Sequence, residues 1–316
     1  MNRLTAVAAL SALIAIGCSS ENVTVAGSPE ATEAPTQSTA PETTAAAAPA
    51  PDLSASDLLS DAIESTVGRA VRGQLRVEGD MVDAGNGAMS VDFQTDAQGD
   101  IEAMLSSGDE QSGPPLTVRI VDGQTYAGFP GVMAAQMFPD FGGETAWFTV
   151  SGQNAEGFAI ACASPLAQLG VQPGGCDPAA DLRRLADAAE EATFAGDEEV
   201  GGVPTRRLRF MVSPASLPSA GAASDGFGDD PAAALGGNIA IDVWVDSDML
   251  LRRLVVDLSS IFGGFAEAFG GEDASTEIPT WQSVVEYYEF DESISIDAPS
   301  PESLLGDYAQ VQGFVG

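Results

Sequence analysis

The sequence NIAIDVWVDSDMLLRRLVVDL, at residues 238–258, carries the pattern that decides the fold. In its first half, apolar side chains occupy every second position: Ile239, Ile241, Val243 and Val245. Alternation with a period of two is typical of a β-strand with one buried face. The second half repeats the pattern less regularly, and Asp246–Asp248 supplies turn residues between the two halves. The stretch therefore predicts a β-hairpin whose apolar face must be covered by another part of the chain.

The same alternation recurs along most of the sequence between residues 53 and 299. It predicts strands at residues 71–78, 89–94, 101–105, 116–120, 125–127, 145–150, 192–199, 203–212 and 280–290. Glycine-rich and Asp-Gly turns separate these runs, as in a meander of antiparallel strands. We expect a sheet with one apolar and one polar face.

Two amphipathic helices are predicted beside these strands. The first begins at the N-cap Ser54 and places Leu58, Leu59, Ala62 and Ile63 on one side. The second begins at Asp177-Pro178 and places Leu182 and Leu185 on one side. Each helix has an apolar stripe that must lie against something, and the sheet is the available surface.

The charge and composition exclude several classes of function. The 316 residues include 12 basic and 47 acidic ones, every basic residue is arginine, and histidine is absent. A net charge of −35 argues against nucleic acid as an electrostatic partner. Without histidine and lysine the chain has no Ser-His or Cys-His pair, no Schiff base and no His-ligated metal site. We expect no enzyme activity, no cofactor and no metal site.

Acidic pairs do not change this expectation. Glu198-Glu199 and Asp229-Asp230 could suggest a glycosidase. Adjacent strand residues point to opposite faces, however, and the second pair lies in a glycine-rich segment, so both are interpreted as solvated charge. The acidic stretch at 224–230 lacks the spacing of an EF-hand.

The N-terminal segment is predicted to direct export. Residues 1–17 have one arginine followed by a short apolar run, which fits a signal peptide and is too short to span a membrane. The run ends in Ala15-Ile16-Gly17-Cys18, which resembles a bacterial lipobox. Cys18 would then carry a diacylglyceryl group, with palmitate as a typical acyl chain, and anchor the protein. The alternative is an ordinary signal peptide with an incidental cysteine.

The rest of the chain divides by composition. Residues 18–52, rich in Ala, Pro and Thr, predict a disordered tether. Residues 53–299 form the predicted domain, and 300–316 a C-terminal tail. Within the domain, Cys162 and Cys176 flank a predicted short helix. In an exported protein they predict a disulfide, which would stabilise the fold by roughly 3 kcal/mol; two free thiols are the alternative.

Several local phrases resemble a known family. They are Val203–Leu208 (VPTRRL), Trp244–Asp246, Leu250–Arg253, Tyr288–Asp291 and Ile296–Pro299. Together with the order of elements, they resemble the actinobacterial LppX/LprG-type lipoproteins, whose fold is related to the LolA and LolB carriers. The resemblance implies a mainly β fold with helices (α+β), a half-open antiparallel β-barrel with helices packed on its concave face. It also implies that acylated lipid or lipoglycan is held between sheet and helices.

The residues expected to line a lipid-binding cavity are the inward-facing apolar ones. They are Leu59, Ile63, Val71, Leu75, Val77, Met89, Val91, Phe93, Leu105, Leu116, Val118, Ile120, Leu208, Phe210, Ile241, Val243, Leu254 and Val256. The alternative is that the same side chains simply fill a core, because a packed core and a lined pocket use the same residue types.

The expected function is that of a lipoprotein anchored at the extracytoplasmic face of the cell membrane. It would bind lipid or lipoglycan and transport it across the envelope, with a membrane transporter as a partner. The alternative is a tethered structural or sensory module of the envelope with no small ligand.

The anchor can be tested by the substitution Cys18→Ala. We expect the variant to be released from membranes or to remain unprocessed, because the thiol that takes the lipid is gone. Membrane fractionation and the electrophoretic mobility of the two proteins measure this. A variant that fractionates and migrates like the wild type would show that Cys18 is not an anchor.

Overall fold

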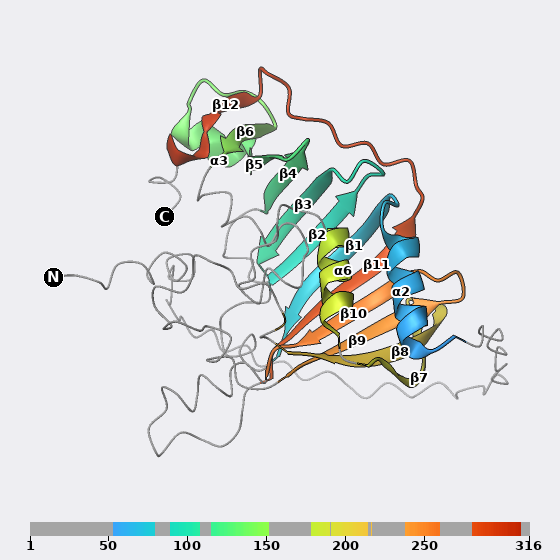
Figure 1. Cartoon of the computed structure of the whole chain (residues 1–316). Helices are drawn as coiled ribbons and strands as arrows, with labels where there is room; N and C mark the ends of the chain where they lie inside the picture. Colours follow the sequence, from blue (N-terminus) through green and yellow to red (C-terminus); the bar gives the residue numbers. More distant parts are fainter. Residues whose placement is uncertain are drawn as a thin grey trace, which may run out of the picture. The chain divides into compact units, whose positions relative to one another are not determined.

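The computed structural model describes residues 53–79, 89–107, 115–151, 178–189, 191–213, 216, 238–259 and 280–310. All of them belong to one compact unit, Ala50–Gly316. Their dominant element is a single twelve-stranded sheet with the order β12-β6-β5-β4-β3-β2-β1-β11-β10-β9-β8-β7. Figure 1 shows this sheet with helices lying over one of its faces.

The strands follow the alternation in the sequence closely. They are β1 (Val71–Glu78), β2 (Met89–Thr95), β3 (Ile101–Ser107), β4 (Leu116–Val121), β5 (Gln124–Pro130), β6 (Thr145–Val150), β7 (Thr193–Val200), β8 (Val203–Val212), β9 (Ile239–Asp246), β10 (Leu251–Asp257), β11 (Gln282–Phe290) and β12 (Leu304–Asp307). In β1 the burial alternates along the whole strand, as expected when one face is covered and the other is not.

The sheet consists of two antiparallel meanders joined at one seam. Strands β1 to β6 pair in sequence order, and so do β7 to β11. The seam is the antiparallel pair β1–β11, in which Leu75 lies opposite Val285. The end strands β12 and β7 are not neighbours, so the sheet stays open. The predicted fold class, an open and mainly antiparallel sheet with helices on one face, is confirmed.

One strand departs from the antiparallel pattern. β12 pairs with β6 in parallel, with Leu304 opposite Trp147 and Asp307 opposite Thr149. A parallel partner needs a long connection, and residues 291–303 provide it by running along the ends of the strands (Figure 1). The predicted domain ends at residue 299, whereas Leu304–Asp307 also belongs to the sheet.

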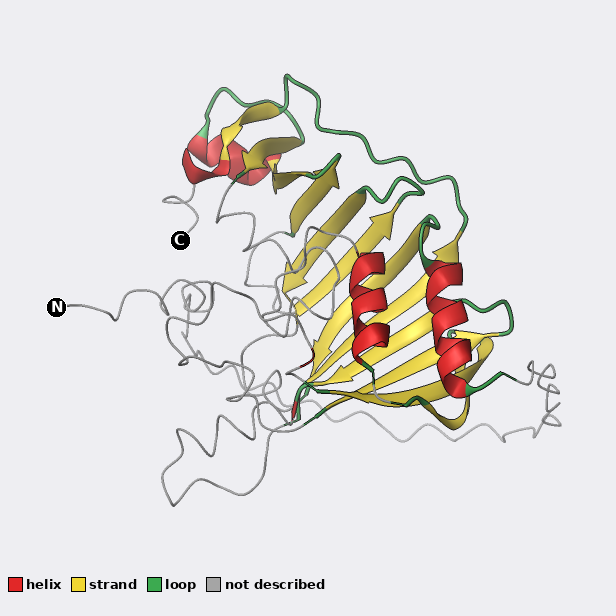
Figure 2. Cartoon of the chain, in the orientation of Figure 1, coloured by secondary structure: helices red, strands yellow, loops and turns green. Residues whose placement is uncertain are grey.

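Three helices complete the described fold. They are α2 (Ala55–Thr66), α3 (Gly131–Met137) and α6 (Pro178–Ala188). Ser54 caps α2 as predicted, with its hydroxyl accepting a hydrogen bond from the Asp57 amide at 3.1 Å. Figure 2 shows α2 and α6 lying across one face of the sheet, which we call the helix-covered face. The opposite side is called the outer face.

The hairpin at 238–258 closes through one aspartate. The Asp246 carboxylate accepts hydrogen bonds from the amides of Asp248 and Leu250, both at 2.9 Å, and from Arg252 Nε at 2.6 Å. Just after the turn the register of β10 against β9 shifts between Leu251 and Arg253, which marks a bulge. The bulge explains why the alternation is less regular in the second half of the hairpin.

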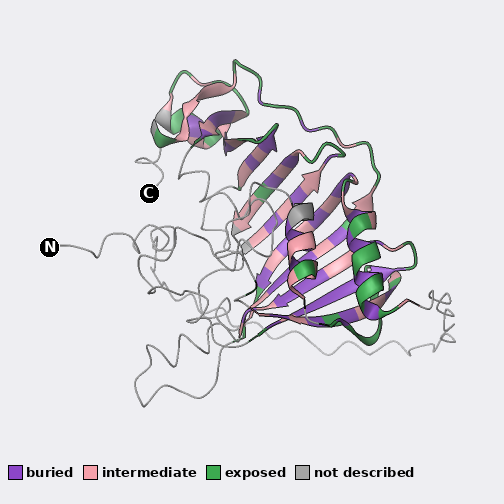
Figure 3. Cartoon of the chain, in the orientation of Figure 1, coloured by how far each residue is buried: buried purple, intermediate pink, exposed green. Residues whose placement is uncertain are grey.

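The main core lies between the sheet and the helices. Its largest fully buried side chains include Phe148, Leu75, Ile101, Leu185, Leu208, Ile241 and Leu254. They come from both meanders, so one apolar cluster runs along the helix-covered face. Figure 3 shows that the strands under the helices are mostly buried, whereas α2 carries exposed residues on its other side.

The outer face is held by arginine–carboxylate pairs instead. Trp244, Val255 and Val284 form a small apolar cluster there. The guanidinium groups of Arg207 and Arg253 lie 5.0 and 5.2 Å from the Trp244 ring centroid, close enough for cation–π contact. Every arginine of the described segments forms an ion pair with a carboxylate.

Asp242 is the centre of this outer network. Its carboxylate accepts four hydrogen bonds, from Nε and Nη2 of Arg207 at 3.1 and 2.8 Å and of Arg209 at 2.8 and 2.7 Å. Burial raises the pKa of Asp242, but the hydrogen bonds from Arg209 and Arg207 outweigh burial and leave this pKa below its ordinary value.

Asp242→Asn should therefore destabilise the protein in a pH-dependent way. We expect a loss of about 1–3 kcal/mol at neutral pH, since hydrogen bonds to a charged group are removed. Because the folded-state pKa of Asp242 is lowered, its contribution is complete above the unfolded value of about 3.9 and is lost as the pH falls below it. The free energies of unfolding of the wild type and the variant should therefore become more similar as the pH falls.

Urea unfolding at pH 7 and pH 3 measures this difference. Asp61→Asn, at an exposed position on α2, is the control and should change little at either pH. An Asp242→Asn defect of the same size at both pH values would contradict the assignment.

Candidate functional site

The apolar residues predicted to face inward come together on the helix-covered face. The buried members of this apolar cluster include Leu59, Ile63, Val71, Leu75, Val77, Val91, Phe93, Val118, Ile120, Leu208, Phe210, Ile241, Val243, Leu254 and Val256. Leu105 and Leu116 pack against the cluster and are partly buried. The side chain of Met89 lies outside the described residues. The sequence thus predicted the composition of this face.

Other members of the cluster were not predicted. They include Leu251, Val285, Tyr287, Phe129 and Phe148. Leu251 was missed because the bulge in β10 turns an unexpected residue inward. Tyr287 was missed because it belongs to the run Val284–Phe290, in which aromatic and apolar residues occupy both parities. In that run the alternation alone does not tell which face is covered.

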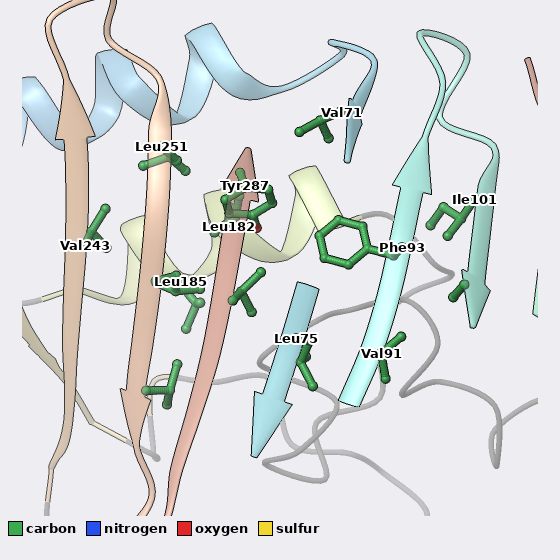
Figure 4. Packing of buried hydrophobic residues seen from close by; sticks show 14 of the residues in the cluster. Val71, Leu75, Val91, Phe93, Ile101, Leu182, Leu185, Val243, Leu251 and Tyr287 are labelled. Carbon is green, nitrogen blue, oxygen red and sulfur yellow. The ribbon is translucent and has the colours of Figure 1, made fainter. Parts of the chain in front are cut away.

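The helices and the sheet meet in a nearly filled interface. Leu59 and Ile63 of α2, Leu182 and Leu185 of α6 and the strand residues Phe210, Val243, Leu251 and Leu254 line a cavity of about 10 Å³. Figure 4 shows Leu182 and Leu185 beside Val243, Leu251 and Tyr287. A volume of this size corresponds to about one water-sized probe. The interface as it stands therefore holds no acyl chain.

Two hydrogen bonds attach α2 to the sheet. The Thr66 hydroxyl accepts one from the buried amide of Leu251 at 3.0 Å, at the bulge. The Ser56 hydroxyl accepts one from the amide of Ala192 at 3.3 Å. These contacts hold both ends of α2.

Helix α6 is joined to the sheet at its C-terminal end, where Ala189 forms an antiparallel bridge with Val212 of β8. Arg183 Nε donates to Glu64 of α2 at 2.8 Å, but both side chains are largely exposed, so the pair contributes little. Burial of Leu182 and Leu185 is the main contact of α6 with the face.

The electrostatics of the helix-covered face are those of an apolar surface. The cluster consists of apolar side chains, and the buried Asp181 of α6 is paired with Arg184 at 3.1 Å. Tyr287 is 5% exposed, and burial raises the pKa of its phenol far above the ordinary value. Its ring meets Phe93 edge to face, with centroids 5.9 Å apart. Gly73 permits this contact, because a Cβ there would lie 2.4 Å from Phe93 Cζ.

A second hollow lies at the far end of the sheet, near β12. It measures about 570 Å³, and its lining includes Phe138, Phe141 and Leu305 with Asp140, Glu144 and Glu302. It shares no lining residue with the cavity under the helices. Three carboxylates beside three apolar side chains do not by themselves define a ligand.

Other candidate chemistry finds no support in the described part of the chain. No cluster of three acidic or thiol side chains there could hold a metal ion. Glu198 binds Arg207 at 3.1 Å and Trp244 Nε1 at 2.9 Å, so it serves the outer network. None of the helices within the described segments is both long and apolar enough to cross a bilayer. Asp229, Asp230, Cys18, Cys162 and Cys176 all lie outside the described residues.

Comparisons with known proteins give structural neighbours only. No protein-family model matches the chain, and no curated protein matches it either. The lipoprotein LppX of Mycobacterium tuberculosis is 13% identical, with 77% of this chain and 98% of LppX covered and a TM-score of 0.42. LprF of Mycobacterium bovis is 13% identical, with 78% and 97% covered and a TM-score of 0.41.

A LolA superfamily protein of Nitrosomonas europaea is more distant. It is 10% identical, with 78% of this chain and 96% of that protein covered and a TM-score of 0.25. The family that the sequence resembles is thus found among the structural neighbours. Since all three TM-scores lie below 0.5, the function proposed below rests on the residues of this chain.

Thr66→Val tests the attachment of α2. We expect a loss of about 1–3 kcal/mol, because the Leu251 amide would be buried without a partner. Thr66→Ser is the matched control: it keeps the hydroxyl and should retain most of the stability. Urea unfolding measures both variants, and equal losses would show that the hydrogen bond is unimportant.

Proposed function

We propose that this protein is a lipid-binding lipoprotein of the cell envelope, which holds acyl chains between the helices α2 and α6 and the sheet. The observation that carries the proposal is the single apolar cluster, which spans both meanders. A surface of this kind suits the hydrocarbon part of a lipid, which needs no polar partner. The resemblance to LppX/LprG-type lipoproteins supports the same function.

The structure described here corresponds to a closed state in this proposal. A cavity of about 10 Å³ leaves no room for an acyl chain, so a lipid enters only when a helix moves away from the sheet. In this proposal α6 moves, because hydrogen bonds hold both ends of α2, whereas the backbone attachment of α6 among the described residues is the bridge between Ala189 and Val212 at its C-terminal end. Acyl chains would then replace leucine side chains against the same strand residues.

The remaining parts of the proposal concern the place and the purpose of binding. Cys18 would carry the diacylglyceryl anchor at the extracytoplasmic face of the membrane, and residues 18–52 would connect it to the domain. Cys162 and Cys176 would form a disulfide. Transport of lipid or lipoglycan across the envelope, with a membrane transporter as partner, is the process in which we place the protein.

A second function is favoured by the packing itself. The small cavity also fits a tethered structural or sensory module that binds no lipid, in which the leucines of α2 and α6 simply complete a core. The two functions differ in whether the purified protein carries lipid, and in whether a larger side chain in the cavity removes that lipid.

Val243→Trp is the test, with Val255→Trp as matched control. Both valines are buried on neighbouring strands, but Val243 lines the cavity whereas Val255 belongs to the outer cluster. Each substitution should cost about 1–3 kcal/mol by overpacking. Only Val243→Trp should also lower the amount of bound lipid, since it occupies the space between helix and sheet.

The measurement is organic extraction of the purified proteins followed by lipid mass spectrometry, beside thermal unfolding. Lipid in the wild type and in Val255→Trp, with a marked loss in Val243→Trp, is the expected result. The absence of lipid from all three proteins would favour the structural module. Equal lipid in all three would place the binding site elsewhere.

A further inference from the structure

Ser283 is a polar residue that is buried among the apolar side chains of the sheet. It lies near the start of β11, opposite Val77 of β1 and Val256 of β10. Both valines belong to the apolar cluster, so Ser283 faces the helix-covered side as well. The residue is 0% exposed, and among the described residues its Oγ has no hydrogen-bond partner.

A buried hydroxyl without a partner weakens the fold, since it loses its hydrogen bonds to water and gains none in return. The backbone around Ser283 offers little compensation, because β11 lies between β1 and β10 and pairs with both. Alanine or valine would suit the packing of this face better. The serine hydroxyl is therefore available for a group that enters from outside the chain.

Tyr287 carries a second hydroxyl on the same face of β11 as Ser283. It lies four residues further along β11, so the two positions are about 13 Å apart at the usual rise of a strand. Its ring meets Phe93 edge to face, and the residue is 5% exposed. Figure 4 shows Tyr287 and Phe93 together in the apolar cluster.

The surroundings decide which ligand group these hydroxyls can serve. A phosphate or carboxylate would need a cation, but each described arginine is already paired with a carboxylate and none belongs to the cluster. An unpaired charge in this place would be very unfavourable. A neutral acceptor such as a carbonyl oxygen needs one donor and brings no charge.

We propose that Ser283 donates a hydrogen bond to the carbonyl oxygen of an acyl ester in the bound lipid, with Tyr287 as a second donor on the same strand. The inference rests on the proposed lipid-binding function and adds ligand selectivity to it. The protein would distinguish ester-linked acyl chains from ether-linked alkyl chains of equal length. The apolar cluster alone has no means to make this distinction.

The test compares two neutral lipids on the full chain. The probes are dipalmitoylglycerol and its ether analogue dihexadecylglycerol, with affinity measured by native mass spectrometry. We expect the wild type to bind the ester about 5–10-fold more tightly, as one hydrogen bond of ordinary strength allows. Ser283→Ala should remove most of the ester preference, leaving only the part that Tyr287 supplies, and should leave ether affinity unchanged.

Three further variants and measurements make the test specific. Tyr287→Phe should reduce the ester preference while keeping the ring against Phe93. Ser90→Ala, on the outer side of β2, is the control and should keep the wild-type preference. The melting temperature of lipid-free Ser283→Ala should equal or exceed that of the wild type, because an unpaired buried hydroxyl is removed.

The outcomes separate this inference from the function on which it rests. Equal binding of ester and ether by the wild type would overturn the role of Ser283 and leave lipid binding intact. Equal loss of both lipids in Ser283→Ala would assign the residue to packing and also overturn the inference. Failure of the wild type to bind either lipid would overturn both proposals.

Discussion

The need to cover one face of an open sheet is the constraint on which the rest of this structure depends. Twelve strands at a spacing of about 4.8 Å make a surface far wider than two helices of about 10 Å each. The helices must therefore be amphipathic and lie side by side, and the strands must alternate. Because α2 and α6 bring leucines to the strands, the cluster stays apolar throughout.

The outer face carries charged side chains, and arginine is the cation in its ion pairs among the described residues. Arginine offers two donors in a plane, so one carboxylate such as Asp242 can bind two guanidinium groups. Arginines also stack on Trp244 and so shield its ring from water. Among the described residues, ion pairs and arginine–Trp244 contacts stabilise the outer face, and the described helices α2 and α6 cover the opposite face.

Local patterns predicted most of this fold, and contacts between distant residues account for what they missed. Alternation identified the strands, and Ser54 identified the start of α2, since both are properties of neighbouring residues. The bulge at Leu251 was not predicted, and the Leu251 amide there donates to the hydroxyl of Thr66, 185 residues away in the sequence, a contact that a local pattern does not contain. Strand β12 has only four residues with similar burial, so its pattern is too weak to recognise.

The candidate site was predictable in composition but not in volume. The period-two alternation of the strands predicts that valines and leucines such as Val91 and Leu208 face inward. Both residues do belong to the one apolar cluster. Whether these side chains line a space or fill it depends on how far α6 lies from the strands, which no residue pattern encodes. Ser283 was not predicted to face inward, because serine is a polar residue that is typical of turns.

The seam between β1 and β11 has a consequence for the order of folding. Val71 pairs with Phe290, so the centre of the sheet forms only after more than two hundred intervening residues have been synthesised. The first meander can pair locally, yet its strand β6 keeps an open edge until residues 304–307 arrive. High contact order slows folding, and an open edge invites pairing with another chain. A partly made copy of this protein is therefore a species that a chaperone would have to protect.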